Sequence, residues 1–84
     1  MKLLQKFIMT GIDQKLGTKM VEIDPDQTVS SIKKEIKQQY DLDAVLAIQF
    51  VTKGIVMNDM DSFSKYQVHP KRDTITILLT QAGG

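Results

Sequence analysis

The clearest pattern of hydrophobic and polar positions runs through residues 74–80. In this stretch Ile75, Ile77 and Leu79 alternate with the residues between them, Thr74, Thr76, Leu78 and Thr80. A period of two is typical of a strand with one buried face. The pattern predicts a strand from Thr74 to Thr80 that buries its two isoleucines and Leu79 and turns Thr76 and Leu78 outward.

The N-terminal part of the chain shows two further strand-like stretches, Leu3–Thr10 and Lys19–Ile23. The segment between them, Gly11–Gly17 (GIDQKLG), is rich in turn residues, so the two stretches are predicted to form a hairpin. Two alternations fit the first stretch almost equally. In one of them Phe7 and Met9 face one side, with Lys6, Ile8 and Thr10 on the other.

One amphipathic helix follows the hairpin. Asp24-Pro25-Asp26-Gln27 ends the second strand, because proline cannot donate to a strand ladder. Thr28 is a good N-cap, since its hydroxyl can accept a hydrogen bond from a free amide of the first helical turn. The predicted helix runs from about Val29 to Tyr40, and its apolar stripe is formed by Val29, Ile32, Ile36 and Tyr40.

The chain then returns to strand patterns. We predict a strand over Ala47–Thr52, with Ile48 and Phe50 inward and Val51 outward, and a short strand over Ile55–Met57 after a Lys53-Gly54 turn. Residues 58–67 look irregular, with Phe63 and Tyr66 as anchors, and residues 69–73 form an exposed turn.

This order of elements predicts an α+β fold in which one mixed sheet of four to five strands packs on one main helix, about 29–40. A simple arrangement, which we predict, places the first and last strands side by side at the centre of the sheet. Parallel pairing there needs a long crossover, and the helix segment supplies one. We expect a single domain, 1–80, followed by a flexible tail, 81–84.

Composition limits the function classes. The chain has 84 residues, a net charge of +1 and no cysteine. Its lysines are scattered among acidic residues, which argues against a nucleic-acid partner. The lack of cysteine excludes disulfides and thiolate metal sites. Since no apolar run is long enough to cross a membrane and the start does not resemble a signal peptide, we expect a cytoplasmic monomer with no membrane partner.

Candidate catalytic or metal-ligating groups are sparse. His69 is the only histidine, and it precedes Pro70 in the predicted exposed turn, so we expect it to be solvated. Asp59 and Asp61 lack the spacing of a calcium loop and are expected in a solvated polar loop. No glycine-rich phosphate loop is present. We therefore predict no catalytic residue, no metal and no bound cofactor.

The sequence closes with Ala82-Gly83-Gly84 directly behind the last predicted strand. Glycines without side chains can enter a narrow cleft and adopt backbone angles that other residues avoid. Such an ending is either a frayed tail or a carboxylate carrier, and the three residues alone do not distinguish the two.

Several segments, in order and at near-constant spacing, resemble ubiquitin and the ubiquitin-like β-grasp proteins. The resemblance covers nearly the whole chain from about Lys6. It is carried by Val21–Val29 (VEIDPDQTV), by Phe63–Val68 (FSKYQV), by the alternation in the last strand and by Gly83-Gly84. A weaker similarity links Ala47–Asn58 to the ubiquitin-fold modifier, and the AGG ending is similar to that of β-grasp sulfur carriers.

The resemblance implies a protein modifier with a C-terminal diglycine. An activating enzyme would use ATP to adenylate the Gly84 carboxylate, a conjugating enzyme would accept the acyl group, and a lysine of a target protein would take it as an isopeptide. Two other functions stay open: a sulfur carrier in which Gly84 becomes a thiocarboxylate, and an interaction domain that is not conjugated.

The resemblance also indicates which residues other proteins would read. Ubiquitin carries its recognition patch at the positions of Val51, Leu78 and Thr76, and Leu16 at the hairpin tip can join them. These residues are our candidate contact for patch-reading receptors. Thr80 and Ala82 stand where related tails usually carry arginine, so they are our candidates for recognition of the tail.

Overall fold

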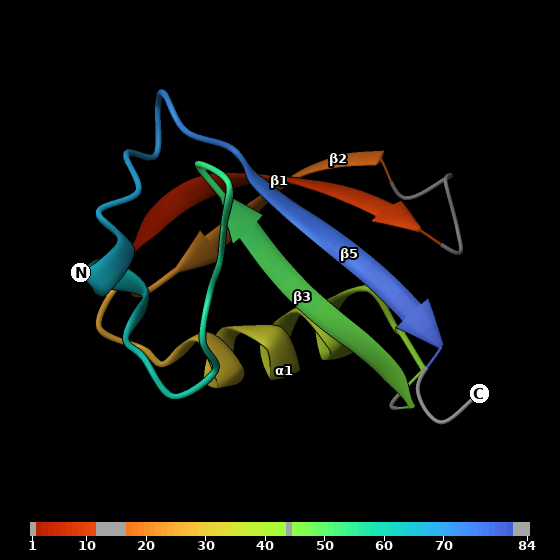
Figure 1. Ribbon diagram of the computed structural model, residues 1–84. Coiled ribbons are helices and arrows are strands. Elements are labelled where there is room, and N and C mark those ends of the chain that lie inside the picture. Colours follow the sequence, from red (N-terminus) through yellow and green to blue (C-terminus); the bar gives the residue numbers. More distant parts are fainter. Residues whose placement is uncertain (1, 12–16, 44, 82–84) are drawn as a thin grey trace.

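Figure 1 shows the computed structural model, which describes residues 2–11, 17–43 and 45–81. In chain order the elements are β1 (Leu3–Gly11), β2 (Gly17–Ile23), α1 (Val29–Gln39), β3 (Leu46–Thr52), β4 (Ile55–Val56), the 3-10 helix η2 (Phe63–Tyr66) and β5 (Ile75–Gln81). The five strands form one sheet, and α1 lies against one of its faces, so the fold has two layers.

The first and last strands form the centre of the sheet, as predicted. The strand order is β2-β1-β5-β3-β4. Strands β1 and β5 are parallel, with Phe7 opposite Ile75, whereas the other three pairs are antiparallel. The crossover between β1 and β5 contains α1, which is what parallel pairing requires. The predicted mixed α+β architecture is therefore confirmed.

Helix α1 begins where its sequence predicts. The hydroxyl of Thr28 accepts a hydrogen bond of 3.2 Å from the backbone amide of Ser31, so the predicted N-cap is confirmed. The basic Lys37 lies in the last turn, where the helix dipole favours positive charge. The helix ends one residue earlier than predicted, because Tyr40 has left the helical conformation and acts as the C-cap.

The hydrophobic core fills the space between α1 and the sheet. Phe7 and Phe50 meet at its centre, with ring centroids 5.4 Å apart. The other buried side chains are Met9, Val21, Ile23, Val29, Ile32, Ile36, Ile48, Met57, Phe63, Ile75, Ile77 and Leu79. No helix among the described residues is long and apolar enough to span a membrane.

Strand β1 adopts the alternation in which Phe7 and Met9 share one face. This inward face also includes a glutamine. Gln5, Phe7 and Met9 are all buried. The Gln5 side-chain amide reaches the 69–73 turn, where its Nε2 donates a hydrogen bond to the carbonyl of Asp73 (2.8 Å). The same Nε2 also donates to the carbonyl of the neighbouring Lys6 in β1 (3.1 Å). These two bonds offset part of the cost of burying the amide.

Other boundaries differ from the prediction by a few residues. Both hairpin strands extend further toward their loop than predicted, and the short strand β4 ends before Met57, which is buried instead. Residues 58–67 are not wholly irregular, because η2 forms within them and buries Phe63. The turn after β3 has positive φ at Lys53 (53°) and Gly54 (74°), a conformation suited to a tight hairpin.

Candidate functional site

The predicted acyl donor follows the end of β5 in the sequence. Gly83, Gly84 and Ala82, like Leu16 in the hairpin loop, lie outside the described residues, so their roles stay predictions. Strand β5 itself pairs with β3 up to its last residue, where Gln81 lies opposite Leu46. Thr80 belongs to this paired backbone, opposite Ala47. The segment that leads to the diglycine is therefore held in the sheet until one residue before Ala82.

The three other predicted recognition residues come together on the face of the sheet opposite α1. Val51 of β3 lies directly opposite Thr76 of β5, and Leu78 lies opposite Gln49. Their neighbours in the strands, among them Ile77 and Phe50, are fully buried on the other face. Since side chains alternate along a strand, Val51, Thr76 and Leu78 share the outer face, as the sequence predicts.

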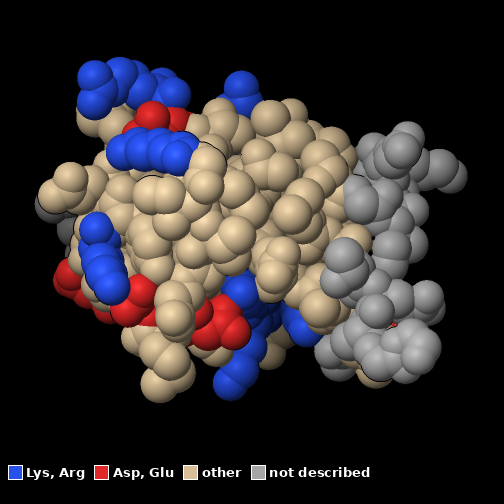
Figure 2. Space-filling model, in the orientation of Figure 1, with Lys and Arg blue, Asp and Glu red and all other residues tan. Residues whose placement is uncertain are grey.

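Pairing between β1 and β5 adds a fourth member to this group. Ile8 lies opposite Thr76 on the side away from Val51. We call the set of Ile8, Val51, Thr76 and Leu78 the outer-face patch. Leu78 is 37% exposed, and the other three are half-buried. Figure 2 shows that the central part of this surface, over β5 and β3, carries neither acidic nor basic side chains, which gather toward its rim.

Sequence reasoning did not assign Ile8 to the patch, and it missed Val56. Val56 of β4 lies opposite Val51 and is 56% exposed. The alternation of each strand shows which residues point outward, but only the pairing of strands shows which of them meet. Ile8 and Val56 are far from β5 in the sequence, so the strand order was the missing information.

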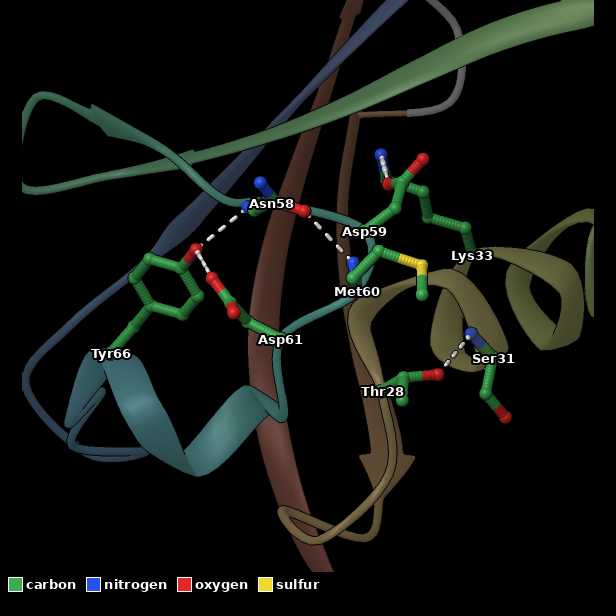
Figure 3. A network of polar contacts seen from close by, with 8 residues as sticks. All are labelled: Thr28, Ser31, Lys33, Asn58, Asp59, Met60, Asp61 and Tyr66. Atoms are coloured by element: carbon green, nitrogen blue, oxygen red, sulfur yellow. Dashed lines mark hydrogen bonds and ion pairs between the residues drawn. The ribbon is translucent and has the colours of Figure 1, made fainter.

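Polar side chains of residues 58–66 form a network that supports the loop after β4 (Figure 3). The hydroxyl of Tyr66 accepts a hydrogen bond of 2.7 Å from the backbone amide of Asn58 and donates one of 2.6 Å to the Asp61 carboxylate. Lys65 pairs with the same carboxylate at 3.1 Å. The hydrogen bond from Tyr66, followed by that from Lys65, holds the pKa of Asp61 below its ordinary value.

Asp59, the other carboxylate predicted in a solvated loop, forms an ion pair with Lys33 of α1. The Lys33 side chain is only 14% exposed, and its ammonium group also lies 5.6 Å from the centre of the Phe50 ring. The loop is thus joined to the helix by charge as well as by its backbone. The loop is largely exposed, as expected for a solvated polar loop, but both aspartates have side-chain partners that the sequence did not predict.

The exposed turn at 69–73 carries the single histidine. His69 is exposed, as predicted, and its Nδ1 accepts a hydrogen bond of 3.2 Å from the amide of Lys71. The backbone amide of His69 donates a 2.8 Å hydrogen bond to the Asp73 carboxylate. This hydrogen bond, together with the positive charges of nearby Lys53 and Arg72, lowers the pKa of Asp73. Within the described part of the chain, no group of three histidine, cysteine or acidic residues is placed to bind a metal.

Solved structures with the same architecture are ubiquitins and ubiquitin-like domains. A computationally designed protein based on the template of human erythrocytic ubiquitin has 21% identity and a TM-score of 0.72, with 96% of this chain and 95% of that chain covered. The UBL domain of Plasmodium falciparum Dsk2 has 22% identity and a TM-score of 0.68, with 93% of this chain and 100% of that domain covered. Caldiarchaeum subterraneum ubiquitin has 16% identity and a TM-score of 0.69, covering 96% and 99%.

At these identities the structural likeness shows the fold alone, which is the ubiquitin-like β-grasp. A search of curated proteins finds no significant match. The family assignment comes from a sequence model of the ubiquitin family, which matches residues 7–82 and so spans nearly the whole described structure. The chain therefore belongs to the ubiquitin family.

Proposed function

We propose that this chain is a ubiquitin-like protein modifier that is activated at the Gly84 carboxylate and conjugated to lysines of target proteins. The observation that carries the proposal is the continuity of the family match with the tail. The match runs to residue 82, the paired strand β5 reaches Gln81, and the two glycines follow directly. A carboxylate at Gly84, present from synthesis or exposed by a protease, would follow the last residue of β5 by three residues in the sequence.

The proposed chemistry uses the chain as a substrate. An activating enzyme joins the Gly84 carboxylate to AMP from ATP and releases pyrophosphate. An enzyme thiolate attacks the resulting mixed anhydride and expels AMP, which leaves a thioester. The amine of a target lysine then attacks the thioester, forms the isopeptide and releases the thiol. The activating and conjugating enzymes supply the catalytic groups, and we place these steps in the cytoplasm, with the chain a monomer until conjugation.

The residues just before the glycines are uncharged, which shapes the partner we propose. Thr80 and Ala82 offer no positive charge to an activating enzyme. A cognate enzyme would therefore bind the tail by backbone hydrogen bonds and close packing rather than by acidic side chains. Residues 73–84 contain no lysine or arginine, so this property extends along the whole last strand and tail.

The outer-face patch supplies the proposed surface for receptors that read the conjugate. Its uncharged side chains lie on the rigid centre of the sheet, held by pairing on both sides of β5. A preformed apolar surface loses little conformational freedom on binding. Leu78 is the most exposed member whose side chain the structure describes, and we propose that it makes the central contact.

Two other functions use the same fold. In a sulfur carrier, the Gly84 adenylate would accept sulfur and become a thiocarboxylate. In an interaction domain, the tail would have no chemistry and the outer face would act alone, a reading that the Dsk2 UBL domain fits as a structural neighbour. We favour the modifier because the diglycine directly follows the family match.

One experiment separates the three. The chain ending at Gly84 carries an N-terminal affinity tag, is expressed in its native cell and is purified under denaturing conditions, beside a control that lacks Gly84. A ladder of heavier products that is present only with Gly84 supports the modifier. Intact mass spectrometry that shows sulfur in place of oxygen at the terminus contradicts it in favour of the carrier. Identical, unmodified products from both chains contradict every role for the tail.

A further inference from the structure

A shallow depression lies at the end of the sheet far from the tail. Its volume is about 490 Å³, and its lining residues come from the start of β1, from β2 and from the turn before β5: Leu3, Leu4, Lys6, Met20, Pro70 and Lys71. Because β1 and β5 are parallel and Phe7 pairs with Ile75, residues 3–6 lie beyond the start of β5. Gln81 is at the opposite end of that strand. The depression is therefore separate from the acyl donor.

The floor of the depression is apolar and accessible. Leu4 is 55% exposed and Met20 is 52% exposed. Met20 lies opposite Lys6 in the β1–β2 pair, and Leu4 is two residues before Lys6 in β1, so all three share the outer face. Burial of large apolar side chains that a folded protein leaves exposed gives a favourable term to binding.

The rim of the depression is positively charged, and this charge is not neutralised by the described part of the chain. Lys6 and Lys71 are exposed and form no ion pair with a described residue. Some other lysines differ in this respect. Lys53 pairs with Asp73 at 3.4 Å, for example, and Lys65 pairs with Asp61 at 3.1 Å. No acidic side chain of the described residues lines the depression, although Glu22 lies next to it, opposite Leu4 in the β1–β2 pair.

Hydrogen bonds fix the turn that forms one wall. The buried Gln5 side chain donates to the carbonyl of Asp73 at 2.8 Å, which joins the turn to β1. The Asp73 carboxylate in turn accepts from the amide of His69 at 2.8 Å and pairs with Lys53. Pro70 and Lys71 therefore lie on a braced turn, so the depression is present before a ligand arrives.

We infer that this depression binds an acidic peptide segment of a partner protein, with one bulky apolar side chain on Leu4 and Met20 and carboxylates beside Lys6 and Lys71. Charge complementarity selects the ligand, because Lys6 and Lys71 form no ion pair with a described residue and the nearby carboxylate of Glu22, opposite Leu4, already pairs with Lys2 at 4.0 Å. The inference does not depend on the chemistry of Gly84. Lys6 lies two residues before Ile8 on the same face of β1, so the depression borders the outer-face patch.

The test titrates the full chain, labelled with 15N, with the peptide DDDLFDDD as a defined probe. NMR spectra follow the chemical shifts of the backbone amides during the titration. We expect the largest amide shift changes at Leu4, Lys6, Met20 and Lys71, and binding that weakens as salt increases. Two control peptides, NNNLFNNN and DDDSSDDD, are expected to bind more weakly. Shifts centred on Val51 and Leu78, or equal binding of the neutral peptide, would overturn the inference.

Matched variants locate the site. Lys6→Gln combined with Lys71→Gln should weaken binding of the probe about fivefold, as two exposed ion pairs would. Met20→Ser should weaken it about tenfold. Lys34→Gln is the control, because Lys34 is another exposed lysine without an ion pair to a described residue but lies on α1. An equal loss with Lys34→Gln would show non-specific attraction and overturn the site. The substituted side chains are exposed, and circular dichroism verifies that each variant is folded.

Two other occupants have their own signatures, and each contradicts the proposal. If a second copy of the chain covers the depression, the amides of Leu4 and Met20 shift with protein concentration in the absence of peptide. If the basic rim serves an anionic membrane, vesicles containing phosphatidylserine bind the chain whereas the acidic peptide does not. Binding of the peptide by a chain that stays monomeric supports the inference.

Discussion

Thr76 of β5 lies directly opposite Val51 of β3 on one side and directly opposite Ile8 of β1 on the other. A single threonine thus joins three strands whose residues are distant in the sequence. The outer-face patch exists only when the first and last strands are paired at the centre of the sheet. A partner that binds the proposed patch would therefore bind only the folded chain.

The two faces of β5 should respond differently to substitution. Ile77 is fully buried, so Ile77→Ala should lower the free energy of unfolding by about 2–5 kcal/mol. Its neighbour Leu78 is 37% exposed, and Leu78→Ser should lower the same quantity by about 1 kcal/mol or less. Urea denaturation followed by circular dichroism measures both. Equal losses would contradict the assignment of the two faces.

The same Leu78→Ser substitution should remove receptors without removing conjugation. Partners that read the patch should be lost from a native purification of the conjugates, whereas the denatured ladder of conjugates keeps its pattern. The control is Met60→Ser, because Met60 is 84% exposed but lies in the loop after β4. Retention of the same partners by both variants would show that the patch is not the surface they read.

The hydrogen bond from Tyr66 to Asp61 should make the stability of the protein depend on pH in the acidic range. Its donor holds the pKa of Asp61 below the ordinary value of 3.8. A lowered pKa in the folded state stabilises the protein above pH 3.8, and this contribution is lost as the pH falls through the lowered value. Tyr66→Phe should raise the pKa of Asp61 toward 3.8 and flatten the loss of stability in that acidic range.

NMR titration of the Asp61 side-chain carboxyl carbon measures this shift. Tyr40→Phe is the matched control, since Tyr40 is the other tyrosine and its hydroxyl accepts only a 3.4 Å hydrogen bond from Gln39 among the described contacts. An unchanged pKa of Asp61 in Tyr66→Phe would show that Lys65, which pairs with the same carboxylate, is sufficient to lower it.

The N-cap of α1 provides an independent measure of local stability. Thr28→Ala removes the hydroxyl that accepts from the Ser31 amide and should lower the free energy of unfolding by about 1 kcal/mol. The control is Ser30→Ala, two residues further along, which removes a hydroxyl for which no hydrogen bond to a described residue is seen. It should be neutral or slightly stabilising, because alanine favours a helix. Thermal unfolding of the two variants side by side decides the matter; equal behaviour would contradict the cap.

Local patterns predicted most of the elements because each has one apolar face. The alternation of Ile75, Ile77 and Leu79 defined β5 to within one residue. The N-cap residue Thr28 and the apolar stripe of the helix that follows it defined α1. These features depend on neighbours in the sequence. The central pairing of β1 with β5 was also predicted, since the helix provides the crossover that parallel strands need.

The features that the sequence did not predict depend on contacts between distant segments. Gln5 is polar yet buried: the alternation of β1 places it on the same face as Phe7 and Met9, and the hydrogen bond to the distant Asp73 carbonyl gives its buried amide a partner. Ile8 and Val56 became part of the outer surface around Val51 through pairing alone. The depression between β1, β2 and the 69–73 turn unites three segments in the same way, so no local motif indicated it.

The central claim is that Gly84 becomes joined to lysines of other proteins, and a branched peptide tests it most directly. Arg72 is the last site for trypsin, so digestion of a conjugate leaves DTITILLTQAGG on the modified lysine. Tandem mass spectrometry of denatured, tagged material from the native cell should find target peptides with this branch, all absent when Gly84 is deleted. Abundant tagged protein without any such branch, or with a thiocarboxylate at Gly84 in its place, would contradict the account.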